Sequence, residues 1–176
     1  MAISLDLVKE LREMTSCGVI DCKKALEEAK GDFEKAKAIL QKRGLEMAAK
    51  KGNRVTKEGR IETYIHPGNK LGVLLEVNCE TDFVAKNEDF CRFTKDVAMH
   101  IAACNPKYVK SEDIPSKVLK AQKDQETFLK EQCLLEQPFV KDPKMSIRDC
   151  LNLLVAKIGE NIVISRFIRF KVSEVE

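Results

Sequence analysis

Apolar residues recur every three or four positions through the first fifty residues, which predicts three short helices. In the first helix this stripe is formed by Leu7, Val8, Leu11 and Met14. The residues Thr15–Gly18 should interrupt it, and Asp21 could cap or begin the second helix. Gly31 then reads as a helix stop and Asp32 as the next N-cap, with Gly44 expected to end the third helix. Residues 1–51 are therefore predicted to form a three-helix module.

The pattern changes to alternation at Arg60, which is typical of β-strands. Ile61, Thr63 and Ile65 alternate with polar or aromatic neighbours, and the segment Pro67–Lys70 has the composition of a turn. The following run, Leu71–Cys79, is more apolar and should be the more central strand. These two segments predict a β-hairpin, preceded by a basic linker at residues 52–59.

The remaining chain mixes both periodicities. Phe90, Phe93, Val97 and Ile101 predict a helix, Ser116 opens another, and Pro138 and Pro143 make residues 134–144 an irregular connection in this reading. Ser146–Asp149 resembles a capping box that starts a helix ended by Gly159. In the last strand, the residues assigned to one face are Ile162, Ile164, Ile168, Phe170 and Val172, with Arg166 interrupting. The fold class predicted is α+β, with the N-terminal helices followed by a helix-backed antiparallel sheet core at residues 60–176.

The composition of the chain indicates its cellular compartment and argues against a membrane protein, a secreted protein and a metal-binding protein. Of the 176 residues, 44% are hydrophobic and 34% charged, and no apolar run approaches the roughly 20 residues of a membrane span. The N-terminus lacks the basic and apolar segments of a secretory signal. The seven cysteines include no Cys-x-x-Cys pair, and with only two histidines no metal site is indicated. Reduced thiols in a cytoplasmic or similarly reducing compartment are expected.

A basic segment lies between Lys42 and Arg60, where seven basic residues accompany two acidic ones. A solvated linker is one interpretation, and contact with an acidic surface or an RNA backbone is the other. No aromatic residue is interleaved with these charges, so base stacking is not indicated and a specific nucleic-acid partner is not expected.

No pattern of catalytic residues is present. The chain has no Gly-x-Ser-x-Gly elbow, no phosphate-binding Gly-x4-Gly-Lys-Ser/Thr loop and no Gly-x-Gly-x-x-Gly turn. His66 is expected on the surface, His100 is expected to be half-buried and structural, and Cys79 has no base at a recognisable spacing. An enzyme is therefore the least supported class, and a binding surface the better one.

The segment Glu76–Asn87 is the strongest candidate for that surface. It leaves an apolar strand and enters a helix through a short corner that places Asp82 beside Phe83. A buried phenylalanine contributes roughly 1.5–3 kcal/mol more than an exposed one, and a ring projecting from a rigid corner could deliver this energy to a partner. The alternative is a capped helix start with Phe83 packed in its own core.

Three separated motifs resemble the elongation factor Ts family, the guanine nucleotide exchange factors for elongation factor Tu. They are Val8–Leu26, Leu75–Asn87 and a C-terminal set comprising Leu135–Phe139, Ala156–Asn161 and Arg166-Phe167. The resemblance implies a ubiquitin-associated-like N-terminal module, a linker and an α+β core. No cofactor and no membrane association are expected. Taken alone, residues 4–51 would also suit a ubiquitin-like-binding module, and the basic segment an RNA-binding one.

The resemblance also implies which residues meet the partner. Thr81, Asp82, Phe83 and Val84 match the segment that disturbs the magnesium site of elongation factor Tu, with Phe83 as the inserted ring. Arg12, Val19 and Ile20 match the positions where the N-terminal module contacts the same GTPase domain. Many family members have Gly-Ala-Gly-Met-Met where this chain has Ser16-Cys-Gly-Val-Ile20. Short members are expected to pair as homodimers, and the final strand, Ile162–Val172, is the candidate surface.

Overall fold

The computed structural model describes residues 3–15 and 17–174, which divide into two compact units. One unit comprises residues 1–55 and 149–161, and the other comprises residues 56–148 and 162–176. Both helices and an antiparallel sheet are present, with helices first along the chain, as the predicted α+β class requires. No helix among the described residues is long and apolar enough to cross a membrane.

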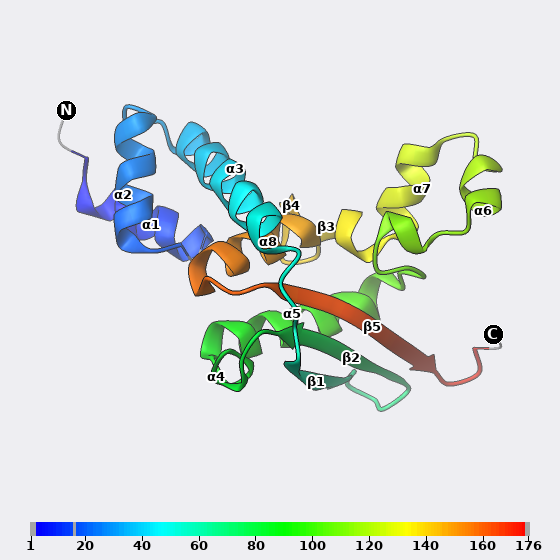
Figure 1. The fold of residues 1–176 in the computed structure, drawn as a ribbon. Coiled ribbons are helices and arrows are strands. Elements are labelled where there is room, and N and C mark those ends of the chain that lie inside the picture. The colour runs from blue at the N-terminus through cyan, green and yellow to red at the C-terminus, as the bar shows by residue number, and fades with distance from the viewer. Residues whose placement is uncertain (1–2, 16, 175–176) are drawn as a thin grey trace. The chain divides into compact units, whose positions relative to one another are not determined.

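The first unit contains the three predicted helices, α1 (Leu5–Thr15), α2 (Val19–Glu28) and α3 (Phe33–Lys51) (Figure 1). The predicted stop and cap between α2 and α3 are confirmed, since Gly31 has φ of +85° and the Asp32 side chain accepts a hydrogen bond from Lys35 N at 3.0 Å. The buried side chains of these helices include Val8, Leu11, Cys22, Ala25, Leu26, Ala36 and Leu40.

Two predicted helix ends in this unit were wrong, and part of the break between α1 and α2 lies outside the described residues, at Ser16. The helix α2 begins at Val19, after Gly18 as its N-cap, rather than at Asp21. The helix α3 continues through Gly44 to Lys51. A Cβ atom at Gly44 would lie 3.3 Å from the carbonyl oxygen of Asn152 in α8 (Ile147–Ile158), so this glycine permits close helix packing and does not end a helix.

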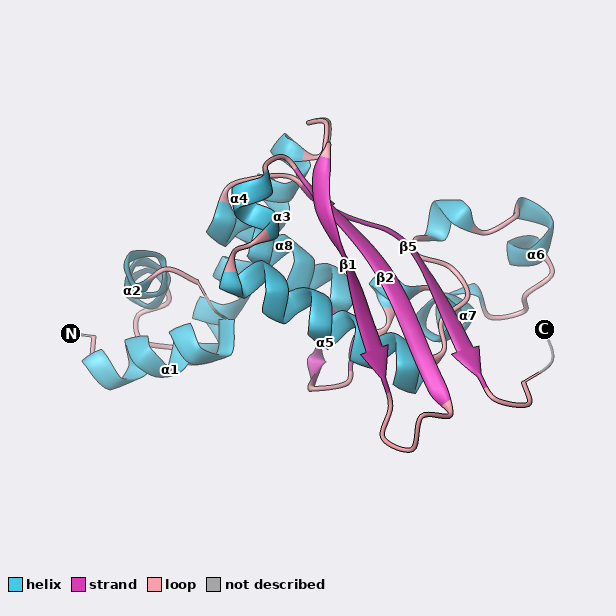
Figure 2. Cartoon of the chain, turned by 90° about the horizontal axis from the view of Figure 1, so that it is seen from below, coloured by secondary structure: helices cyan, strands magenta, loops and turns pink. Residues whose placement is uncertain are grey.

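The second unit is built on a three-stranded antiparallel sheet with strand order β1 (Glu58–Ile65), β2 (Leu71–Cys79) and β5 (Ile162–Lys171) (Figure 2). The predicted hairpin and the central place of Leu71–Cys79 are confirmed. Its turn uses Gly68 and Asn69 at φ of +93° and +53°, and His66 N donates to Leu71 O.

One face of this sheet is covered by α5 (Glu88–Cys104), which packs against β1 and β2. The predicted stripe of Phe90, Phe93, Val97 and Ile101 is buried along this helix. It ends at Asn105, which adopts a left-handed conformation, and Arg169 of β5 donates from Nε to the carbonyl of Ala102 in its last turn.

The predicted single apolar face of β5 was wrong because the strand contains a bulge. Glu76 pairs with Arg166 while Val77 pairs with Ile164, so Ser165 is an extra residue. A one-residue shift reverses the faces of a strand. Of the residues assigned to this face, Ile162 and Ile164 are buried, whereas Ile168, Phe170 and Val172, which lie beyond the bulge, are exposed.

The face of the sheet opposite α5 is consequently apolar and exposed. We call it the outer sheet face, and its residues are Ile61, Ile65, Leu74, Ile168, Phe170 and Val172. The strand register places Leu74 opposite Ile168 and Gly72 opposite Phe170. Glu62 is buried instead, because it lies on the side of β1 that faces α5.

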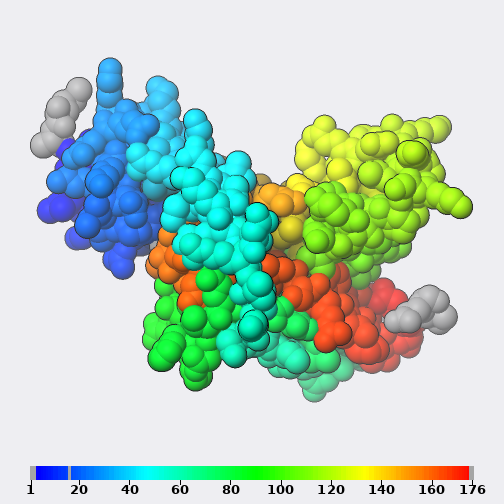
Figure 3. All heavy atoms as spheres, in the orientation of Figure 1, coloured from blue at the N-terminus to red at the C-terminus, as the bar shows by residue number. Residues whose placement is uncertain are grey.

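The chain between α5 and α8 contains η1 (Ser111–Asp113), α6 (Ser116–Lys120), α7 (Gln125–Gln132), η2 (Leu134–Glu136) and the strands β3 (Pro138–Phe139) and β4 (Asp142–Ser146). The strands form a small hairpin where an irregular connection was predicted. Pro143 is tolerated in β4 because this strand has only one neighbour, so one of its edges needs no donor. The α6 and α7 helices contain no buried residue, and their atoms form a separate yellow-green lobe of this unit in Figure 3.

His100 connects α5 to the β3–β4 hairpin from a fully buried position, deeper than the half-buried one predicted. Its Nδ1 accepts from Val140 N at 3.2 Å, and its Nε2 lies 2.9 Å from Gln137 Oε1. The Gln137 amide is oriented by its donation to Glu131 O, so the imidazole is neutral with the proton on Nε2. Burial lowers the pKa of His100, and the hydrogen bond that His100 donates to Gln137 offsets part of this effect.

We predict that this buried imidazole makes stability depend on pH. Because the pKa of His100 is lower in the folded chain than the ~6.5 of an unfolded histidine, the unfolded state binds the extra proton first. The free energy of unfolding should be at its full value above about pH 6.5 and fall as the pH decreases below it, by at most about 1.4 kcal/mol per pH unit. Urea unfolding between pH 7.5 and 5 measures this slope.

The matched control is His100→Gln, which removes the titrating group and keeps a polar side chain. Its slope between pH 6.5 and 5 should be smaller than that of the unsubstituted chain, with the carboxylates contributing equally to both. Equal slopes in the two proteins would contradict this assignment.

Candidate functional site

The predicted corner is a four-residue helix, α4 (Asp82–Ala85), between the end of β2 and the start of α5. Its backbone bonds are local: Ala85 N donates to Thr81 O, Lys86 N to Phe83 O, and Asn87 N to Val84 O. So short a helix has no stability of its own in water, and its geometry must come from the elements that flank it.

Both ends of the corner are fixed by hydrogen bonds. Cys79, the last residue of β2, donates from Sγ to Thr81 O at 3.1 Å. On the other side, Asn87 caps α5, its Oδ1 accepting from Asp89 N at 2.9 Å and from Phe90 N at 3.4 Å. The corner is thus held between a strand end and a capped helix start.

The two large apolar side chains of α4 point in different directions. Val84 is 9% exposed and anchors the corner against the unit, while Phe83 is 81% exposed. The prediction that Phe83 projects from the corner is therefore supported over the alternative that it packs in its own core. An exposed large ring on a fixed backbone is a feature of surfaces that bind a partner.

An ion pair lies beside the ring. Lys86 Nζ is 2.8 Å from Asp82 Oδ2, at the i,i+4 spacing that brings side chains together on a helix. The hydrogen bond from Lys86 lowers the pKa of Asp82, and the same contact raises the pKa of Lys86. Both groups are exposed, so the pair orients the Asp82 carboxylate more than it stabilises the fold.

The other predicted contact residues lie in the first unit, at the ends of two helices. Arg12 is exposed in the last turn of α1, and Val19 and Ile20 are 52% and 69% exposed in the first turn of α2. Beneath them Cys22 is fully buried, with a pKa raised by burial. The exposed pair Val19 and Ile20 is an apolar surface backed by a packed core.

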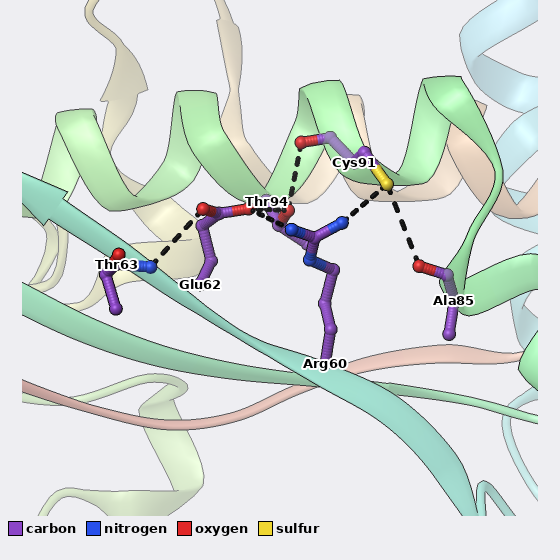
Figure 4. Close-up of polar contacts among 6 residues, drawn as sticks. All are labelled: Arg60, Glu62, Thr63, Ala85, Cys91 and Thr94. Atoms are coloured by element: carbon purple, nitrogen blue, oxygen red, sulfur yellow. Dashed lines mark hydrogen bonds and ion pairs between the residues drawn. The ribbon is translucent and has the colours of Figure 1, made fainter.

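Sequence reasoning missed a polar cluster between β1 and α5, behind the corner (Figure 4). Arg60 lies 3.0 Å from Glu62 through Nη2 and contacts Cys91 Sγ through Nη1, and Thr94 Oγ1 lies 3.0 Å from Glu62 Oε2. The signal was available, because residues two apart in a strand share a face. Arg60 and Glu62 therefore had to lie on the same side, opposite Ile61.

The basic segment from Lys42 to Arg60 is only partly a linker. Its first part belongs to α3, which extends to Lys51. Arg43 pairs with Glu28, Lys51 donates to Gly159 O, and Arg60 pairs with Glu62. Several of these charges therefore serve the fold. No group of three or more metal-ligating side chains was found within residues 3–15 and 17–174.

Comparison with known proteins supports the resemblance seen in the motifs. A family model described as Elongation factor TS matches residues 7–127. An Elongation factor Ts of Desulfotalea psychrophila is 51% identical over 195 aligned residues, covering 98% of this chain and 99% of that protein. An Elongation factor Ts of Thermodesulfovibrio yellowstonii is 48% identical, covering 100% and 99%. That of Carboxydothermus hydrogenoformans is 48% identical, covering 98% and 90%.

These similarities extend over nearly the whole length of the chain and of its relatives, well beyond the segment that carries Phe83. The class is that of translation elongation factors. The chain belongs to the elongation factor Ts family.

We predict that Phe83→Ala leaves stability almost unchanged, because the ring is already in water. The loss in free energy of unfolding should stay below about 0.5 kcal/mol, as for most surface substitutions. Phe90→Ala is the matched control on the same segment. Its ring is fully buried, so the loss should be about 3–5 kcal/mol. Urea unfolding of both variants measures the difference, and a comparable loss in the two would place Phe83 in the core.

Proposed function

We propose that this chain is a guanine nucleotide exchange factor for elongation factor Tu, and that the α4 corner is the part that promotes GDP release. The observation that carries this proposal is the 81% exposure of Phe83 on a corner fixed at both ends. Membership of the elongation factor Ts family supports this choice of partner and of the direction of the effect. No covalent chemistry is assigned to the chain, so the proposal is a binding function and not an enzymatic one.

The mechanism follows from how magnesium holds a nucleotide. The ion requires nearly octahedral geometry and bridges phosphate oxygens to the protein, so a small displacement of a ligand weakens it. A ring inserted beside such a site acts by occupying space. The exchange factor then weakens GDP binding by the same ratio by which GDP weakens binding of the exchange factor. The ring can contribute no more than the difference between its contact energies with the GDP-bound and the GDP-free partner.

The remaining predicted contacts extend this surface. We propose that residues 1–51 act as a ubiquitin-associated-like module, joined through residues 52–59 to the core at 60–176. Arg12, Val19 and Ile20 are its contact residues for the same GTPase domain. In the domain at residues 60–176, Thr81, Asp82 and Val84 are the contact residues that accompany Phe83. The seven free cysteines suit a reducing compartment, and we propose the cytoplasm as the location.

We predict that Phe83→Ala slows GDP release from elongation factor Tu at saturating factor. The roughly 1.5–3 kcal/mol from burying one phenylalanine corresponds to roughly 10- to 150-fold. Stopped-flow release of a fluorescent GDP measures the rate constant. Asp82→Ala should have a smaller effect, because its carboxylate is exposed and paired with Lys86.

The matched control for this experiment is Val140→Ala, an exposed apolar truncation in the same unit and outside the corner. It should release GDP at the unsubstituted rate. An unchanged rate constant for Phe83→Ala would remove the ring from the mechanism, and a failure of the unsubstituted protein to accelerate release would remove the proposed function itself.

We also propose that two chains associate through the outer sheet face. This surface gathers six exposed apolar residues, five on the three strands and Val172 directly after β5, and exposed apolar patches of this kind mark association sites. The predicted candidate, the final strand, contributes Ile168 and Phe170 to it. A homodimer would cover these side chains by pairing each face with its copy.

We predict that Leu74→Glu abolishes this association, because it places a charge at the centre of the apolar face. Sedimentation at micromolar concentrations should give a dimer for the unsubstituted chain and a monomer for the variant. Val140→Glu is the control, since Leu74 and Val140 are both 45% exposed and Val140 lies outside the outer sheet face. A monomeric mass for the unsubstituted chain at every concentration would contradict the proposal.

A further inference from the structure

The polar cluster behind the corner links the sheet to the last residue of α4. Arg60 of β1 donates from Nη1 to Cys91 Sγ at 2.6 Å, and the Cys91 thiol donates to the carbonyl of Ala85 at 3.7 Å (Figure 4). Ala85 ends α4, where helix carbonyls lack partners within the helix. The sulfur of Cys91 thus lies between a guanidinium and the backbone of the corner.

The arginine itself is fixed from the other side. Glu62 Oε2 lies 3.0 Å from Arg60 Nη2 and 3.0 Å from Thr94 Oγ1, and its Oε1 accepts from Thr63 N at 3.3 Å. The Glu62 side chain is 8% exposed and that of Arg60 is 30% exposed. The guanidinium is therefore held in one orientation by a buried carboxylate that is itself hydrogen-bonded to α5.

An ion pair with its carboxylate buried and its guanidinium partly buried is a poor way to stabilise this layer. Apolar side chains of similar volume are often as stabilising or more so, because charges lose their hydration on burial. The pair also leaves Arg60 Nε as a buried side-chain atom with no hydrogen-bond partner in the described part of the chain. Because the Arg60–Glu62 pair loses hydration and leaves one donor without a partner among the described residues, it is better explained by the side chains that it positions than by a gain in stability.

We propose that Arg60 and Cys91 are positioning residues for exchange, holding α4 so that Phe83 projects at a fixed angle. This inference rests on the function proposed above and deepens it by naming what orders the ring. The path runs from Glu62 to Arg60, then through the Cys91 sulfur to the Ala85 carbonyl, two residues beyond Phe83. Without it, α4 keeps the contacts at its two ends and the anchor of Val84, but the carbonyl of its last residue loses the link to the sheet, and the ring samples unproductive positions.

The first test is Cys91→Ala, which removes the sulfur and leaves the Arg60–Glu62 pair intact. Loss of one hydrogen-bonded link should lower the maximal rate of GDP release roughly threefold to tenfold, with little change in the factor concentration needed for half-maximal effect. Cys104→Ala, at the opposite end of the same helix, is the control and should match the unsubstituted chain. Cys91→Ser keeps a donor and an acceptor and should recover part of the rate.

The second variant separates positioning from stability. Arg60→Met combined with Glu62→Leu replaces both charges with apolar side chains, so no charge is left buried alone. Its unfolding midpoint should stay close to that of the unsubstituted chain, while its maximal rate falls as in Cys91→Ala. Arg43→Met, which breaks the exposed pair with Glu28, controls for loss of an arginine–glutamate contact.

A readout without the partner distinguishes this inference from the proposed function. Hydrogen exchange at the amides of Lys86 and Asn87, which donate within the corner, should accelerate threefold to tenfold in both test variants, while the amide of Val97 in the middle of α5 should not change.

Accelerated exchange at the corner together with slower GDP release supports the inference. Unchanged amide exchange overturns it, whatever the release rates show. Accelerated hydrogen exchange with an unchanged rate of GDP release also overturns it, because the ordering of the corner would then have no role in nucleotide release. If the unsubstituted chain does not accelerate GDP release, the proposed function fails and the corner retains only a structural ordering.

Discussion

A helix of four residues cannot bury an aromatic side chain on one face and a valine on the other without support from its surroundings. In α4 this constraint is resolved by turning Val84 inward and leaving Phe83 in water, with the backbone fixed by Cys79 on one side and Asn87 on the other. The ring therefore contributes almost nothing to folding. Its contact energy remains available, and the rigid backbone means that little conformational entropy is lost when it is used.

Between α5 and the sheet, some side chains stabilise the fold and others determine where the corner lies. Phe90 and Phe93 fill the space between α5 and the sheet in the ordinary way, whereas Arg60, Glu62 and Thr94 occupy neighbouring positions with polar groups. Apolar packing determines that α5 lies on the sheet. The directional contacts determine where the start of α5, and hence the preceding corner, lies along it.

Much of the fold follows from periodicity, and the failures have specific physical causes. The stripe of α5 and the alternation in β1 and β2 are strong signals, because one face of each element is buried. Gly44 resembles a helix stop in the sequence, and only the nearby carbonyl of Asn152 shows that it serves close packing. The β3–β4 hairpin was concealed by two prolines, and its anchor to His100 is a contact between residues far apart in the chain.

Part of the candidate site could likewise be predicted from the sequence, and part could not. Phe83 could be found from the sequence, since a large ring beside a carboxylate on a corner is unusual and the motif is distinctive. The link from Arg60 through Cys91 to Ala85 could not, because it joins three elements whose contacts depend on how α5 lies on the sheet. Sequence spacing could place Arg60 and Glu62 on one face but could not show what they touch.

The bulge in β5 has a consequence for where this chain can change in length. Ser165 lets one strand serve two apolar surfaces, with Ile162 and Ile164 directed to the covered side and Ile168 and Phe170 to the open side. Deleting Ser165 would reverse the two faces of the strand beyond it. Ile168 and Phe170 would then turn toward the covered side, and Arg169 would lose its contact with the end of α5. The helices α6 and α7 contain no buried residue, so a change in chain length should be tolerated there and not at this strand.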